Sequence, residues 1–559
     1  MTTLADSIAQ ANFLWGHTTA RCLADHGVQV IFFSPGSRST PLVLACEQEP
    51  RLLCFPILDE RTAAFLALGY SKRTNTPAAL ICTSGSAPTH WYPAITEAFY
   101  SGIPLLLLSA DRPPELQECG AGQTICQERL FGSFVREFYS VPLPAEDFQS
   151  LNSLHSLIAQ AYTRATSLPT GPVHLNFAFR EPLWPSNPDL YQPPDRPPIA
   201  PTTHSTNPNK FPSLIDLKYA CNPVIIAGLD CPVSLPSSFH SIPILCDSLS
   251  PLRENESPSR ILRYENLLRD PNFIHSARPD LFIVLGPLPT SKTLRSWIEQ
   301  SGVQRLVIEP SGRKVDPLKG PSRSIALPYD CLSNLELPPP SPDWLAKWIK
   351  AEKIIEGKWQ SEWDQLPFNS EPKITRTLSE RLPSGSLFYC ANSMPIRDIE
   401  WFWIAGNKNR NLYGARGVNG IDGTLGTAMG IAHLAEKPTY LLTGDLAFLH
   451  DSNALLFASD LMGSLTVFLI NNQGGGIFEN LAVSKLSEFE KCFATPQHCD
   501  FEKLCLAHSV TYTLCKNESD LTSAISIPPD RGVHVIEIKT NRKADFATRK
   551  HLLSLSPSS

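Results

Sequence analysis

The sequence lacks the features that would direct the protein into a membrane or onto nucleic acid. Its apolar runs, of which Ile103–Leu108 is typical, fall far short of the roughly 20 residues that a membrane-spanning helix needs. No long basic run is present, and a formal net charge of −6 gives no reason to expect a nucleic-acid partner. The N-terminal residues have neither a basic segment nor a long apolar segment, so we expect no signal peptide, no membrane insertion and a cytoplasmic location.

The 15 cysteines lack the spacing of a metal site, since none forms a C-x-x-C pair. Several lie inside apolar runs, among them Cys54, Cys82, Cys246 and Cys390. Metal ligation and a disulfide framework are the functional alternatives, but the pattern favours buried, reduced thiols.

Length and composition predict a globular protein of two to four domains, with 559 residues, 42% of them hydrophobic and 18% charged. Strand and helix signals alternate in three stretches, which predicts three doubly wound α/β domains with mostly parallel sheets. Ten prolines in Pro182–Pro212 indicate a linker, and Leu337–Pro342 is a second proline-rich boundary. We expect an N-terminal domain, a linker, a central domain, a helical connector and a C-terminal domain, at residues 1–181, 182–212, 213–342, 343–373 and 374–559.

Apolar runs bounded by turn residues give the expected strands. They lie at Val28–Phe33, Leu52–Leu58, Ala78–Thr83, Pro104–Ser109, Val173–Phe177, Val224–Ala227, Ile242–Leu245, Leu281–Leu285, Leu306–Ile308, Leu387–Cys390, Thr439–Leu442, Leu465–Ile470 and Val533–Ile538. Amphipathic helices are expected at Glu60–Lys72 and Asp343–Leu366. The first and third domains could be related to each other.

The most informative stretch is Thr443–Phe478. Gly444-Asp445 follows one expected strand, a helix-like segment occupies Ser452–Leu461, and Asn471-Asn472 follows the next strand. Because parallel strands end at the same edge of a sheet, the acid and the amide should lie close together there.

A carboxylate, an amide oxygen and a backbone carbonyl are hard oxygen ligands that suit Mg²⁺. The glycines of Gln473–Gly476 would let the backbone approach a diphosphate. Two ordinary turns after two ordinary strands are the alternative. The 24 residues from Ala447 to Ile470 separate the two motifs by the spacing of the thiamine diphosphate fingerprint, although Leu446 stands where many such enzymes have glycine.

Two segments of the first third have candidate roles. Ser34–Thr40 lies between a strand and a helix, where backbone N–H groups and Arg38 would form an anion cradle, or where a plain turn would leave the arginine solvated. Glu60 begins a helix, and the helix dipole alone would favour a carboxylate there. A thiamine diphosphate site also needs a carboxylate from outside the diphosphate-binding domain, to activate the aminopyrimidine ring.

Further polar residues lie in loops after expected strands. Arg112 would bind a carboxylate or pair with Glu115, and Gln123 would donate to a carbonyl or face water. Arg397 and Arg416 suit bidentate recognition of carboxylates. Ile421 would be an apolar support beneath a cofactor or an ordinary core residue.

Taken together, these segments resemble the 2-succinyl-5-enolpyruvyl-6-hydroxy-3-cyclohexene-1-carboxylate (SEPHCHC) synthase family of menaquinone biosynthesis, which depends on thiamine diphosphate. The resemblance rests on blocks in the first and third domains, SPGSRSTPL (34–42), DERTAAFLALG (59–69), CTSGSA (82–87), ADRPPEL (110–116), GAGQTI (120–125), NSMPIRD (392–398), GARGVNGIDG (414–423), GDLAFLHD (444–451) and NNQGGGIF (471–478). Met394, Val418 and Gly122 depart from the usual pattern, and Gly122 removes a side chain next to Gln123.

The resemblance implies roles for individual residues. Asp445, Asn472 and the Gly474 carbonyl would hold Mg²⁺, with Mn²⁺ as an alternative ion. Glu60 of a neighbouring subunit would activate the cofactor, and Ile421 would support it. The remaining cofactor contacts would be Ser393, Gly444, Leu446, Ile477 and Phe478. The substrates would be bound by Ser37, Arg38, Arg112, Gln123, Ser393, Lys292, Arg397 and Arg416. Four of these residues, Arg38, Gln123, Ser393 and Arg397, would also act at the reacting carbonyl, and Lys292 could instead be a surface lysine.

The implied reaction is the decarboxylation of 2-oxoglutarate, followed by conjugate addition of the four-carbon fragment to isochorismate. A homodimer or a dimer of dimers, with sites at the subunit interface, is also implied. An acetolactate-synthase-like enzyme or a 2-oxoacid decarboxylase is the alternative within the cofactor class. A catalytically inactive scaffold is a further alternative, although it predicts damage at Glu60, Asp445 or Asn472, all of which are present.

Overall fold

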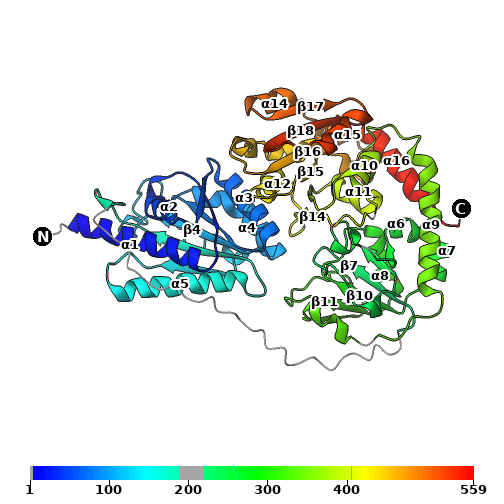
Figure 1. Ribbon diagram of the computed structural model, residues 1–559, viewed down its shortest axis with the longest axis horizontal. Coiled ribbons are helices and arrows are strands. Elements are labelled where there is room, and N and C mark those ends of the chain that lie inside the picture. The colour runs from blue at the N-terminus through cyan, green and yellow to red at the C-terminus, as the bar shows by residue number, and fades with distance from the viewer. Residues whose placement is uncertain (1–3, 189–219, 256, 336, 405, 559) are drawn as a thin grey trace. The chain divides into compact units, whose positions relative to one another are not determined.

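A computed structural model of the chain describes residues 4–188, 220–255, 257–335, 337–404 and 406–558 (Figure 1). These residues form three six-stranded sheets, and the strand pairs within each sheet are parallel. The prediction of doubly wound α/β domains with mostly parallel sheets is therefore confirmed. Most of the expected linker, 189–212, lies outside the described residues, and the predicted domain limits stay predictions.

The chain divides into two compact units that do not follow the order of the sequence. The first unit combines the N-terminal part with Ala415–Leu434 and His450–Met462, and the second contains Asn207–Gly414, Ala435–Leu449 and Gly463–Ser559.

The first sheet has the strand order β2-β1-β3-β4-β6-β5. Its strands are β1 Val30–Phe33, β2 Leu53–Pro56, β3 Ala78–Cys82, β4 Leu105–Asp111, β5 Glu137–Val141 and β6 Pro172–Ala178. The flanking helices are α1 Leu4–Asp25, α2 Thr40–Glu47, α3 Glu60–Thr74, α4 Tyr92–Ser101 and α5 Phe148–Thr166. Ile31 belongs to the core beneath α1, α2 and α5, whereas its neighbour Phe32 contacts Tyr70 of α3. Because side chains alternate along a strand, helices cover both faces of this sheet.

The third sheet repeats this topology in the order β14-β13-β15-β16-β18-β17. Its strands are β13 Leu387–Cys390, β14 Asn411–Gly414, β15 Thr439–Gly444, β16 Ser464–Asn471, β17 Thr511–Cys515 and β18 Gly532–Lys539. Its helices are α10 Glu371–Arg381, α11 Met394–Phe402, α13 Asp445–His450, α14 Phe501–Ala507, α15 Glu518–Ser526 and α16 Arg542–Ser554. Helix α12 Thr424–Ala432, which lies between β14 and β15 in sequence, belongs to the first unit. The same strand order in both sheets supports the idea that the two domains are related. One local prediction was wrong, because the helix after β15 begins at Asp445 itself and Ser452–Phe457 is a 3₁₀ helix.

The middle sheet has a different order, β12-β11-β10-β7-β8-β9. Its strands are β7 Pro223–Ala227, β8 Ile244–Cys246, β9 Arg260–Ile261, β10 Leu281–Leu285, β11 Arg305–Ile308 and β12 Ser322–Ile325, and its helices are α6 Tyr264–Leu267, α7 Pro271–Ser276, α8 Lys292–Ser301 and α9 Trp344–Trp363. Helix α9 places Trp344, Trp348, Trp359 and Trp363 in the core of this domain. The Trp359 indole donates to the Leu552 carbonyl of α16, so the connecting helix joins the middle domain to the C-terminal helix (Figure 1). No described helix has both the length and the apolar character needed to cross a membrane.

Helices α3 and α12 of the first unit cross with their backbones in contact. A Cβ atom on Gly69 of α3 would lie 2.0 Å from the Thr427 carbonyl oxygen, and one on Gly430 of α12 would lie 2.1 Å from the Leu66 carbonyl oxygen. Glycine is therefore required sterically on both helices. The crossing joins α3, which begins with Glu60, to α12, which begins three residues after Ile421.

We expect Gly430→Ala to lower the thermal unfolding midpoint by several degrees. The added methyl forces two backbones apart, and overpacking of this kind costs about 1–3 kcal/mol. Gly357→Ala is the matched control, because Gly357 is also inside a helix, α9, but no atom lies within 4 Å of the added Cβ. Alanine is the better helix former there by about 1 kcal/mol, so this variant should be neutral or slightly stabilised. Equal midpoints for the two variants would contradict the steric account.

Within the second unit, α11 is joined to the middle domain through buried charges. Arg253 donates to the carbonyl oxygens of Ile399, Glu400 and Trp403 at the end of α11. Glu400 accepts from the Ser248 amide at 2.5 Å, while its Oε1 has no hydrogen-bond partner among the described residues. Burial, together with the nearby Asp247 carboxylate, raises the pKa of Glu400 to about 8.

This raised pKa predicts a pH-dependent stability. The folded protein holds a proton on Glu400 that the unfolded chain releases near pH 4.3, so the contribution of Glu400 to stability should fall as pH rises from about 4 to 8. Glu400→Gln stays neutral at every pH. We therefore expect the thermal midpoint of the variant, relative to that of the native chain, to rise by several degrees between pH 5 and pH 8.5. A difference that does not change with pH would show that Glu400 is ionised throughout.

Candidate active site

The parallel pairing of β15 with β16 brings the predicted metal ligands to one sheet edge. Gly444 is opposite Ile470, so Asp445 and the 471–474 segment leave the sheet side by side. The Gly474 amide donates to Asp445 Oδ2 at 2.9 Å, and the Leu446 amide donates to Asp445 Oδ1 at 2.7 Å. Gly474 adopts a φ of +131°, and a Cβ there would lie 2.2 Å from the Ala494 carbonyl oxygen, so the loop needs glycine at this position.

The amide of Asn472 leaves its oxygen unused by the protein. Its Nδ2 donates to Glu371 Oε1 at 2.8 Å, which leaves Oδ1 for another ligand. That oxygen is buried and has no hydrogen-bond partner among the described residues. A buried acceptor without a partner is costly, and a bound cation would satisfy it. The donor set of one carboxylate, one amide oxygen and one carbonyl fits Mg²⁺ on a diphosphate.

Asp445 itself is almost completely buried, and burial raises its pKa to about 6. The Glu371 carboxylate adds to this increase, while the amides of Gly474 and Leu446 oppose it. Among the described residues, no group of three His, Cys, Asp or Glu side chains could hold a metal ion. The predicted site fits this finding, because it has only one carboxylate and its other ligands would be an amide oxygen and a backbone carbonyl.

The other predicted residues of the second unit lie around this sheet. Gly444 and Leu446 flank Asp445, and Ile477 and Phe478 belong to the 3₁₀ turn Gly476–Asn480 that follows the glycine loop. Phe478 packs against the backbone of Gly475.

Ser393, the residue before α11, has the left-handed φ of +72°, an unusual conformation for serine that functional sites often contain. Arg397 donates to the Ser393 carbonyl at 2.6 Å, which ties the arginine to this strained residue. Lys292 is exposed at the first position of α8, as expected for a surface lysine.

In the first unit, Glu60 lies at the first position of α3 and lines a pocket of about 500 Å³. The pocket is formed by Leu58, Asp59, Glu60, Arg61, His90, Asn453 and Leu456. Asp59 caps α3 by accepting from the Arg61 and Thr62 amides, and its second oxygen accepts from Asn453 at 2.9 Å. Asp59 rather than Glu60 therefore caps this helix.

Helix α12 is capped by a residue that the sequence did not single out. Its N-cap is Gly423, which has no side chain, and the Gly426 amide donates instead to Asp451 at 2.7 Å. Asp451 is fully buried, and burial raises its pKa to about 6. Ile421 is partly buried just before this helix.

Glu97 of α4 is a second residue that sequence reasoning missed. Its carboxylate accepts from the amides of Gly417 and Val418 at 2.9 and 2.8 Å, and it is itself buried. These bonds fix the loop between Arg416 and Ile421. Glu97 occurs in an amphipathic helix with no motif around it, so only the folded chain reveals this anchor.

The two arginines of the N-terminal segments lie close to each other at the end of the first sheet. Arg38 is buried, and it donates to the Phe179 carbonyl and to Glu181 at 2.9 and 2.8 Å, so the alternative of a solvated arginine was wrong. Burial lowers the pKa of Arg38, and the positive charge of Arg112 lowers it further. The Nε atoms of Arg38 and Arg112 are buried and have no hydrogen-bond partner in the described part of the chain.

The loop after β4 brings further polar groups to this edge. Glu115 pairs with Arg180, which argues against the alternative that it pairs with Arg112. Gln123 is exposed but donates to the Ser84 carbonyl at 3.1 Å and has a left-handed φ of +56°. Ser37 is exposed at the start of a 3₁₀ turn, Ser37–Ser39.

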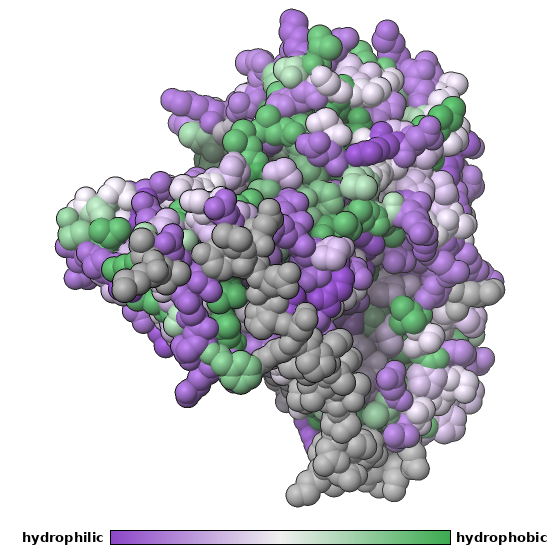
Figure 2. Space-filling model, turned by 60° about the vertical axis from the view of Figure 1, so that its left-hand side comes forward, coloured by the Kyte–Doolittle hydropathy of each residue, from purple (hydrophilic) through white to green (hydrophobic). Residues whose placement is uncertain are grey.

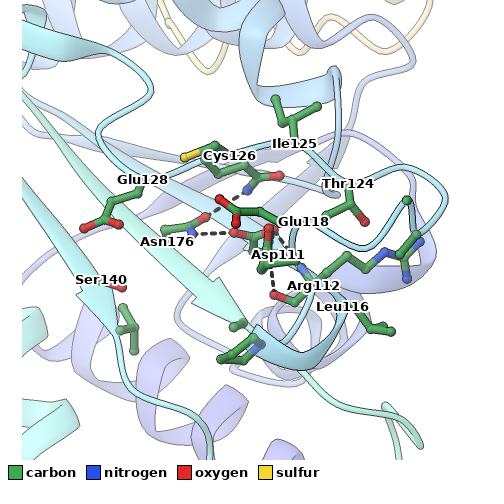
Figure 3. A pocket seen from close by; sticks show the side chains of 17 residues that line it. Asp111, Arg112, Leu116, Glu118, Thr124, Ile125, Cys126, Glu128, Ser140 and Asn176 are labelled. Atoms are coloured by element: carbon green, nitrogen blue, oxygen red, sulfur yellow. Dashed lines mark hydrogen bonds between the residues drawn. The ribbon is translucent and has the colours of Figure 1, made fainter.

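Arg112 also lines a pocket of about 550 Å³ (Figure 3). Arg38 and Gln123 are not among the residues that line it. In this pocket Asp111 accepts from Asn176 at 2.7 Å, and Glu118, Cys126 and Glu128 lie around the same space. Burial raises the pKa of Asp111. Three acidic residues, Asp111, Glu118 and Glu128, therefore line the pocket together with Arg112.

Two family models match the chain and define its class. The N-terminal TPP binding domain of thiamine pyrophosphate enzymes matches residues 15–130, and the C-terminal TPP binding domain matches residues 401–538. The chain is therefore a thiamine pyrophosphate enzyme, and thiamine diphosphate is its cofactor.

Curated relatives define the family more closely. The chain is 39% identical to the 2-succinyl-5-enolpyruvyl-6-hydroxy-3-cyclohexene-1-carboxylate synthase of Synechococcus elongatus, over 97% of this chain and 96% of the relative. It is 37% identical to the synthase of the same name from Trichodesmium erythraeum, over 96% and 97% of the two chains, and 36% identical to that of Rippkaea orientalis, over 97% and 96%. The chain belongs to the SEPHCHC synthase family, and the predicted resemblance is confirmed.

Proposed function

We propose that the protein decarboxylates 2-oxoglutarate and adds the remaining four-carbon fragment to isochorismate by conjugate addition, in menaquinone biosynthesis. The observation that carries the assignment of substrates is the pair Arg38 and Arg112. Burial lowers the pKa of Arg38, the positive charge of Arg112 lowers it further, and a buried Nε on each arginine has no protein partner among the described residues. Two neighbouring cations with unused donors are suited to carboxylates, and both substrates are dicarboxylates.

The residues would divide the chemistry as follows. Bound thiamine diphosphate supplies a carbon nucleophile and accepts the electron pair that is left when CO₂ departs. Asp445, Asn472 and the Gly474 carbonyl would hold Mg²⁺, with Mn²⁺ as an alternative, against the diphosphate. Glu60 would hold a proton on a ring nitrogen of the aminopyrimidine, and Ile421 would support the cofactor from below.

Arg38, Arg112, Gln123 and Arg397 would hold substrate carboxylates and orient the reacting carbonyl. Arg416 would add a charge from the loop that Glu97 fixes, and Ser393 would lie next to Arg397. The exposed Lys292 would contribute only a weak, screened attraction.

The protein is proposed to act as a homodimer or a dimer of dimers in the cytoplasm, with each site completed by a neighbouring subunit. Leu58 and Leu456 line the Glu60 pocket, and they are 70% and 47% exposed. Large apolar side chains exposed at the mouth of a pocket are typical of surfaces that a partner covers. Figure 2 shows apolar patches between polar side chains on the face that it presents.

The reaction is tested by following the release of CO₂ and the loss of isochorismate together, with thiamine diphosphate and Mg²⁺ present. We expect equal amounts of the two, and no turnover without thiamine diphosphate. Glu60→Gln should lower the rate by about 100-fold or more, because it removes a general acid–base group. Release of CO₂ at an unchanged rate without isochorismate would instead favour the alternative, a 2-oxoacid decarboxylase.

Mixed dimers test whether subunits share the site. Glu60→Gln and Asp445→Asn should each be nearly inactive alone. If Glu60 of one subunit acts with Asp445 of the other, each mixed dimer retains one intact site, and random mixing restores about a quarter of native activity. If both residues act within one subunit, each site of the mixed dimer carries a defect, and no activity returns.

A further inference from the structure

Glu371 lies beneath the predicted metal site and contacts one of its ligands. It is the first residue of α10 and is 4% exposed. Its Oε1 accepts from Asn472 Nδ2 at 2.8 Å and from Thr540 Oγ1 at 2.9 Å. Its Oε2 accepts from Arg549 of α16. Both oxygens of the carboxylate are therefore in use, and every bond is one that it accepts.

Arg549 keeps this carboxylate in its acceptor state. The guanidinium is 3% exposed and also pairs with Asp398 of α11 at 2.6 and 2.7 Å. Nearby acids raise the pKa of Arg549, so it stays charged. A guanidinium can only donate hydrogen bonds, so its bond to Oε2 makes that oxygen an acceptor.

An acceptor on one side of an amide decides which way the amide faces. Asparagine can present either its NH₂ group or its oxygen to a neighbour, and the two orientations differ by a half-turn. A carboxylate can face only the NH₂ group. Asn472 must therefore direct Oδ1 away from Glu371, and that oxygen is the buried one that has no partner among the described residues.

We propose that Glu371 is a positioning residue that fixes the amide of Asn472 with its oxygen toward the metal. This inference rests on the metal site of the proposed function. It adds a residue from outside the two strand-end motifs, in a helix that precedes both in sequence. Replacing a residue that hydrogen-bonds to a metal ligand often changes metal affinity 10- to 100-fold.

Glu371→Gln tests the proposal with little change in volume. The new amide would direct its oxygen to Arg549 and its NH₂ group to Asn472, which would turn the Asn472 amide and put NH₂ where the oxygen was. We expect the affinity for Mn²⁺ to fall at least tenfold. The measurement titrates Mn²⁺ at a saturating concentration of thiamine diphosphate and follows the free ion by electron paramagnetic resonance, so it does not depend on turnover.

A second substitution separates positioning from general damage to the fold. Aspartate at position 472 presents an oxygen on both sides, so Asn472→Asp in the Glu371→Gln background can accept from the amide introduced at position 371 and still bind the metal. We expect this double variant to bind Mn²⁺ more tightly than Glu371→Gln alone. A variant weakened only by misfolding would not recover in this way, and thermal unfolding of each protein reports misfolding directly.

Asp545→Asn is the matched control. Asp545 is also buried, and it accepts from the Glu371 amide at 3.0 Å, but the structure shows no bond from it to Asn472 among the described residues. Its Mn²⁺ affinity should match that of the native chain. Native affinity in Glu371→Gln, with affinity lost in Asn472→Ala, would overturn the positioning role alone. Native affinity in Asn472→Ala and Asp445→Asn would overturn the metal site itself.

Discussion

The parallel pairing of β15 with β16 is the constraint on which the cofactor site of the second unit depends. Two neighbouring strands that run in the same direction must end at the same edge, and Gly444 is paired with Ile470 there. Asp445 comes directly after β15, and the 471–474 segment lies at the end of β16. This register brings the two close together. The contact between the Gly474 amide and Asp445 is a direct consequence. A shift of the register by one residue would point the flanking side chains to the opposite faces of the sheet.

The charged residues buried around that edge stabilise one another. Carboxylates inside a protein are costly unless cations or donors surround them, and Arg549 pairs with both Glu371 and Asp398. These charges connect α10, α11 and α16 beneath the loop that follows β16. In the first unit, Asp59, Glu97 and Asp451 have a comparable role, since each accepts from backbone amides near Glu60, Arg416 or Ile421. Rigid supports of this kind keep the candidate catalytic groups in place without taking part in the chemistry.

Much of the fold could be predicted from the sequence. The strands that could not be predicted have one physical property in common. Those that the sequence did not reveal, β5, β9, β12, β14 and β17, are all edge strands, partnered on one side only. Edge strands are partly exposed, as in β12, where no residue is buried, so they lack the continuous apolar run that marks a central strand. The motifs at strand ends could be predicted because the roles of their glycine, acidic and amide residues depend on neighbouring residues in the sequence. The roles of Glu97, Glu371 and Asp451 could not, because their partners are distant in sequence.

In the proposed reaction, one protein both removes CO₂ from 2-oxoglutarate and joins the remaining carbons to isochorismate. Mass spectrometry of the product formed from fully ¹³C-labelled 2-oxoglutarate and unlabelled isochorismate tests this coupling. We expect labelled CO₂ and an adduct that carries the other labelled carbons together with the intact isochorismate skeleton. A labelled four-carbon aldehyde, or a product made from two labelled fragments and no isochorismate, would contradict the proposed reaction.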